Sequence, residues 1–72
     1  MRFVIYTDGH LPAHIHVIGD GELKIHLQHP EEVPLLVRAV NWKASHQTPA
    51  MYEVKGRREF LLQAWRDIRG GD

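Results

Sequence analysis

Alternating apolar and polar residues in the first half of the chain predict β-strands. In residues 14–18 histidines alternate with β-branched residues, and in residues 22–27 polar residues alternate with leucine and isoleucine. A period of two sends successive side chains to opposite faces of a sheet, so each segment has one apolar and one polar face. Residues 2–7 are rich in β-branched and aromatic types and predict a further strand. Residues 35–42 are apolar and predict a fourth, with a helix as the alternative.

The turn at Gly19-Asp20-Gly21 determines how two of these strands pair. Their apolar residues share a face only if the loop has three residues, with Gly21 in the left-handed conformation of a bulge-type turn. This parity predicts the following pairs: Ile18 with Glu22, Val17 with Leu23, His16 with Lys24, Ile15 with Ile25, and His14 with His26. We therefore expect His14 and His26 to face each other about 5 Å apart at Cβ, with His16 on the same face.

The last third of the chain predicts a helix. Thr48 and Pro49 suit its N-cap and first position, and Gly70-Gly71 ends the pattern. Apolar residues at helical spacing between them are expected to pack on the sheet: Tyr52, Val54, Phe60, Leu61, Ala64, Trp65 and Ile68. Gly56 weakens a helix by roughly 1 kcal/mol relative to alanine, so a break there is the alternative to one continuous helix.

These elements predict one α+β domain over residues 1–72, a small and mainly antiparallel sheet of three to four strands with one C-terminal helix packed on one face. The absence of cysteine excludes disulfides and thiolate metal sites and fits a cytoplasmic protein. No apolar run reaches the roughly 18 residues of a membrane span, so we expect no membrane contact. Net charge is zero, which argues against nucleic-acid binding by overall charge alone.

Histidines supply the candidate chemistry, because imidazole titrates near neutral pH and is a common metal ligand. Three of the six histidines lie within residues 10–16, around a turn that contains Pro12. The candidate binding residues are His10, Pro12, His14, His16, Lys24 and His26. Three imidazoles on one face, those of His14, His16 and His26, suit zinc or nickel, although Lys24 opposes a cation there. The same face is alternatively a phosphate or partner contact, or an ordinary solvated surface.

The histidine run also resembles a known family. His10-Leu11-Pro12-Ala13-His14-Ile15-His16-Val17 is similar to the His-x-Pro-Pro-His-x-His-Val signature of a small bacterial family, number 4160 in the domain-of-unknown-function series. Residues 58–65 resemble its closing Arg-x-Glu-Leu-Leu-x-x-Trp helix. Ala13 replaces a usual proline, and Phe60 replaces a usual leucine. The resemblance implies proteins that often lie beside a second small protein, in an arrangement like that of toxin–antitoxin or regulatory pairs.

A second motif is excluded by one residue. The histidine-triad nucleotide hydrolases carry a His-x-His-x-His run, whereas position 18 of this chain is isoleucine. The chain is also too short for that fold.

The sequence therefore favours a regulatory, toxin–antitoxin-like binding module that uses a histidine-rich sheet face and has no complete catalytic constellation. Its expected partners are a small cognate protein from the same operon, RNA, or a second copy of the chain in a homodimer. The alternative is a histidine-dependent or metal-assisted nuclease or hydrolase. In that hypothesis His14 or His16 is the base or ligand, and Lys24 or Arg58 stabilises phosphate charge.

Overall fold

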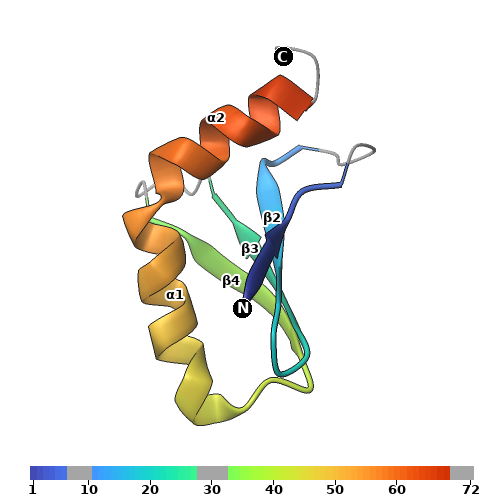
Figure 1. Cartoon of the computed structure of the whole chain (residues 1–72), viewed down its shortest axis with the longest axis vertical. Helices are drawn as coiled ribbons and strands as arrows, with labels where there is room; N and C mark the ends of the chain where they lie inside the picture. Colours follow the sequence, from blue (N-terminus) through green and yellow to red (C-terminus); the bar gives the residue numbers. More distant parts are fainter. Residues whose placement is uncertain (7–10, 28–32, 69–72) are drawn as a thin grey trace.

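The chain folds into a four-stranded antiparallel sheet and two helices (Figure 1). This computed structural model describes residues 1–6, 11–27 and 33–68. The strands follow the order β1-β2-β3-β4, so that β1 and β4 are the edges. Their bounds are β1 (Arg2–Val4), β2 (His14–Ile18), β3 (Glu22–His26) and β4 (Leu35–Val40). A 3₁₀ turn, η1 (Ala44–His46), precedes α1 (Gln47–Gly56) and α2 (Arg58–Ile68). The α+β prediction is confirmed, and the single helix was wrong.

The predicted register of β2 and β3 is confirmed at all five pairs, from Ile18 with Glu22 to His14 with His26. The predicted left-handed conformation of Gly21 is wrong, because its φ lies outside that region. Glycine is required there for space, since a Cβ atom would overlap the carbonyl oxygen of Val40 and the backbone of Asn41. Asn41 itself has a positive φ of 55°, which ends β4 at Val40, two residues earlier than predicted.

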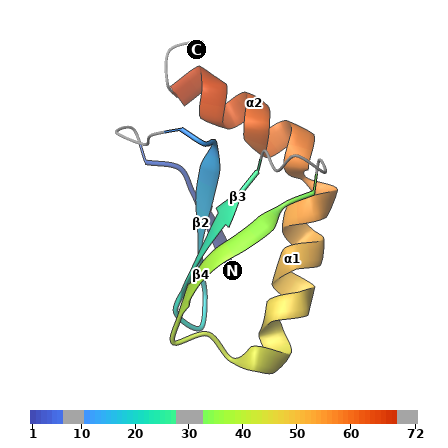
Figure 2. The same ribbon diagram turned by 180° about the vertical axis from the view of Figure 1, so that it is seen from behind.

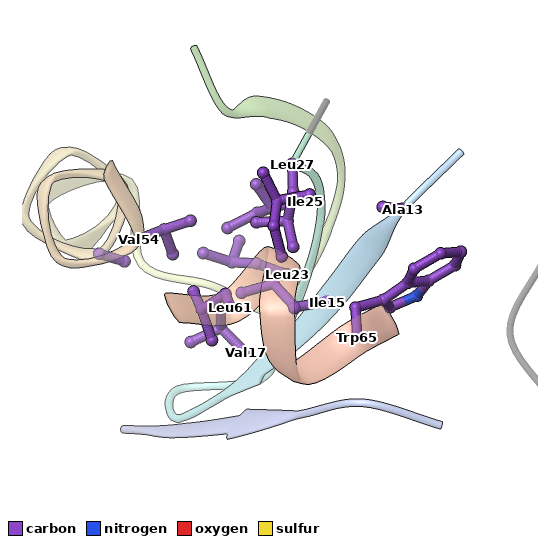
Figure 3. Close-up of a cluster of buried hydrophobic side chains, with 11 residues drawn as sticks. Ala13, Ile15, Val17, Leu23, Ile25, Leu27, Val54, Leu61 and Trp65 are labelled. Carbon is purple, nitrogen blue, oxygen red and sulfur yellow. The ribbon is translucent and has the colours of Figure 1, made fainter. Parts of the chain in front are cut away.

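The helices cover only one face of the sheet. Alternate side chains of β2 and β3 are completely buried on that face, which confirms the predicted apolar side: Ile15, Val17, Leu23 and Ile25. Figure 3 shows Val54 of α1 and Leu61 and Trp65 of α2 gathered with them in one core. The intervening residues of both strands are only partly buried. The opposite side of the sheet is thus left without a covering layer among the described residues.

The helical region departs from its prediction in two ways. Helix α1 begins at Gln47, directly after η1, so Thr48 is inside the helix and not its N-cap. The chain then breaks between Gly56 and Arg58, as the alternative interpretation expected. The change of direction takes side chains out of a single apolar stripe, and Tyr52 and Phe60, expected in the core, are 69% and 72% exposed. Within the described residues, no helix is long and apolar enough to cross a membrane.

Candidate functional site

The uncovered side of the sheet, which we call the outer face, carries most of the predicted site. Strand register places these side chains on it: Arg2, Val4, His14, His16, Ile18, Glu22, Lys24, His26, Leu35, Arg38 and Val40. Of the six predicted site residues, it brings together His14, His16, Lys24 and His26. Pro12 is exposed just before β2, after a cis Leu11–Pro12 peptide bond. His10 lies outside the described residues.

The hydrogen bonds of His14 and His16 show which ring nitrogen of each carries the proton. Nδ1 of His14 donates to the carbonyl oxygen of Pro12 at 2.9 Å, and Nδ1 of His16 donates to Oε2 of Glu22 at 2.5 Å. A carbonyl or an ionised carboxylate can only accept, so each Nδ1 carries the proton. In the neutral ring this leaves the Nε2 lone pair available.

Glu22 is a site residue that the sequence interpretation missed. It supplies a carboxylate directly beside the histidines of the outer face. The predicted register already contained the signal, because Glu22 and His16 are diagonal neighbours on one face of the β2–β3 pair. Tyr6 adds an aromatic ring on the other side of His16, with ring centroids 4.7 Å apart in an edge-to-face arrangement.

His26 completes the group of three imidazoles. Its ring centroid lies 6.3 Å from that of His14, and the His14 and His16 centroids are 5.5 Å apart. Burial lowers the pKa of His26 below its ordinary value, and the charges of Lys24 and His14 lower it further. Desolvation and neighbouring cations both penalise the imidazolium, so His26 favours the neutral form.

The three histidines by themselves do not form the predicted zinc or nickel site. In the part of the chain that the structure describes, no group of three histidine, cysteine, aspartate or glutamate side chains could hold a metal ion. Being on one face of a sheet is therefore not sufficient to bring three imidazoles together as ligands of one ion.

A row of basic side chains crosses the middle of the outer face. His16 of β2 pairs with Lys24 of β3, and Lys24 pairs with Arg38 of β4. We call these three residues the cationic row. Like charges directly opposite each other on adjacent strands destabilise a sheet. Among the described residues of this face, Glu22 is the only carboxylate, and it is already bonded to His16.

Arg58, the suggested phosphate-stabilising residue, lies elsewhere. Its Nε donates to the carbonyl oxygen of Leu27 at 2.8 Å, and its Nη1 donates to Glu59 at 2.9 Å. It thus ties the start of α2 to the end of β3 and is mostly buried. This position is wrong for a group that would act with the histidines of the outer face.

Asp20 and His46 form a second polar contact, to which the sequence assigned no role. Nδ1 of His46 donates to Oδ2 of Asp20 at 2.8 Å, and the backbone N–H of Lys43 donates to the same oxygen at 3.1 Å. The hydrogen bond from His46 is the main cause that lowers the pKa of Asp20. These contacts fasten the β2–β3 turn to the segment before α1, which is a structural role.

Comparison with known proteins tests the family resemblance that the histidine run suggested. A search of curated proteins and a search of solved structures found no match. A family model described as a domain of unknown function (DUF4160) matches residues 1–66, which span the whole sheet and most of α2. The chain, with its histidine-bearing outer face, therefore belongs to the DUF4160 family.

Proposed function

We propose that this protein is a binding module that holds an acidic surface of a small partner protein on its outer face, as one member of a toxin–antitoxin-like or regulatory pair. The cationic row carries this proposal. Lys24 and Arg38 are placed opposite each other at a cost to the fold, and the described residues of the face offer them no free carboxylate. A partner that supplies carboxylates removes this cost when it binds.

The histidines contribute oriented rings to the same contact. Fixed by Pro12 and Glu22, the rings of His14 and His16 hold one orientation, which reduces the entropy lost on binding. Salt screens the attraction of Lys24 and Arg38 for carboxylates, so binding should weaken as salt is added.

The test is calorimetric titration with the small protein that is encoded beside this chain. Neutralising Lys24→Gln and Arg38→Gln should each weaken binding about tenfold, which corresponds to about 1.4 kcal/mol. The double variant His14→Ala/His16→Ala should also weaken it while the fold is retained by circular dichroism. Arg66→Gln on α2 removes the same charge on the covered side of the sheet, so it should change affinity less than twofold. Equal affinities in all four variants, or no complex with the wild-type chain, would refute the proposal.

A second candidate function, a histidine-dependent ribonuclease, is favoured by the bond between His16 and Glu22. A carboxylate that holds Nδ1–H leaves Nε2 as the base that would remove a proton from a ribose 2′-hydroxyl, and Lys24 lies opposite His16 to attract phosphate. The test is cleavage of a labelled single-stranded RNA, with and without zinc, nickel or manganese. Activity that His16→Gln abolishes and Glu22→Gln reduces would support it. Intact RNA under all conditions would exclude it.

A further inference from the structure

Strand β4 is an apolar edge of the sheet. It pairs with β3 on one side only and lies at the end of the strand order. Leu35, Val37 and Val40 are 41%, 42% and 37% exposed along it. The register shift opposite Lys24 and Ile25 leaves Val37 without a partner in β3. Exposed edges with apolar side chains are templates for pairing with another extended segment.

A groove runs beside this edge. In Figures 1 and 2, β4 lies between β3 and α1. A cavity of about 370 Å³ is found between the start of β4 and α1, and we call it the β4–α1 groove. Leu36 lines one side, and Met51, Tyr52 and Lys55 line the other. An edge strand beside a helix, with an apolar groove between them, is the arrangement in which domains accept a peptide as an added strand.

Charge identifies the kind of segment that fits. Lys55 lines the groove, Arg38 projects from β4 on the outer face, and no carboxylate is among the groove-lining residues described. A second copy of the chain would bring its own Arg38 to the same edge, so antiparallel pairing of two β4 strands concentrates like charge. A strand with glutamate or aspartate side chains neutralises it.

We propose that β4 and the β4–α1 groove bind an extended, acidic segment of a partner protein, which adds to the sheet as a fifth strand. Alternate side chains of an added strand point to opposite faces. Apolar ones enter the groove between Leu36 and Met51, acidic ones reach Arg38 on the outer face, and the charge of Lys55 at the groove rim attracts the acidic side chains through space. The inference rests on the proposed function, in that the strand belongs to the acidic partner, and it specifies how that partner is held.

The test uses synthetic peptides of nine residues in which valine alternates with glutamate, labelled with fluorescein and followed by anisotropy. We expect saturable binding that is at least tenfold tighter than that of the matched valine–lysine peptide. Lys55→Glu should weaken binding at least fivefold, because it reverses a charge in the groove without touching the outer face. Val37→Glu should weaken it as well, since a charged edge residue opposes pairing and this one also repels the glutamates of the peptide. Arg66→Gln on α2 should leave peptide binding within twofold.

Backbone amide shifts in NMR spectra locate the peptide and separate the two proposals. Changes in β4 and α1 support the added strand. Absence of saturable binding, equal affinity in the Lys55→Glu variant, or changes confined to His16 and Lys24 would overturn it, while the outer-face proposal would stand on its own titration. A dimeric mass of the free protein that Val37→Glu converts to a monomer would assign the edge to a second copy and would also overturn it.

Discussion

Replacing Arg38 by glutamate should stabilise the folded protein, although it alters a residue that we assign to partner binding. Arg38 stands opposite Lys24 in the β3–β4 register, so the substitution turns a like-charge pair into an opposite-charge pair. Opposite-charge cross-strand pairs contribute roughly 0.2–1 kcal/mol, and like charges are unfavourable. Removing repulsion and adding attraction should therefore raise the free energy of unfolding by about 1 kcal/mol. In a domain of this length that corresponds to a rise in Tm of about 4–8 °C.

Urea unfolding followed by circular dichroism measures this change. Arg38→Gln is the matched control and should give about half of the gain, because it only removes the repulsion. In a Lys24→Gln background, Arg38→Glu should give no gain. At 1 M NaCl, where the Debye length is about 3 Å, the gain should largely disappear.

The result that refutes the reasoning is a loss of stability in Arg38→Glu, or a gain that survives both high salt and removal of Lys24. Either result would mean that Lys24 and Arg38 do not interact across the strands. The cationic row would then not destabilise the fold, and the proposed binding function would lose the observation on which it rests. A gain in stability accompanied by a loss of partner affinity is the combination that we expect of a binding surface.

Three further predictions concern the fold. Gly21→Ala should destabilise the protein by about 1–3 kcal/mol, because the new methyl group overlaps a backbone carbonyl oxygen. Gly56→Ala lies in open space at the end of α1 and should stabilise the protein by about 0.5–1 kcal/mol. Thermal melts that rank the two variants in the opposite order would contradict this. The pKa of His26 is lowered in the folded state, so the free energy of unfolding is highest above pH 6.5 and falls as pH drops through the folded-state pKa. Unfolding curves between pH 7.5 and 5 should show a free energy of unfolding that depends less on pH in His26→Gln than in the wild type. Identical pH dependence in the two proteins would contradict the shift. Arg58→Ala should cost about 1.5–3 kcal/mol in urea denaturation, because its charged bond to the Leu27 carbonyl is lost, and a cost below about 0.5 kcal/mol would show that the bond is unimportant.

The β2–β3 hairpin shows how much of the structure the local sequence pattern predicts. Ile15 and Val17 alternate with histidines, and a loop of three residues is the only one near Gly21 that keeps the apolar residues on one side. A shift by one residue would exchange the faces, so parity alone was sufficient to place His14 opposite His26. The same parity contained the contact between His16 and Glu22, which was overlooked because only directly opposed pairs were considered.

Other features depended on segments that are distant in the sequence. Arg38 joins the cationic row only because β4 pairs with β3 across an irregularity at Lys24 and Ile25, which alternation along β4 does not encode. His46 bonds Asp20, which lies 26 positions earlier in the sequence, and the residues around either one do not predict this contact. Tyr52 fitted a helical stripe and is nevertheless exposed.

The sequence by itself determined the elements, the hairpin register and the face that carries His14, His16 and His26, because each follows from backbone periodicity over a few residues. Tertiary structure decided between one continuous helix and a break at Gly56, and it alone placed Arg38 opposite Lys24 and opened a groove beside β4. These features arise when separate elements pack together, and the free energy that selects one arrangement comes from the shared core and not from any single segment.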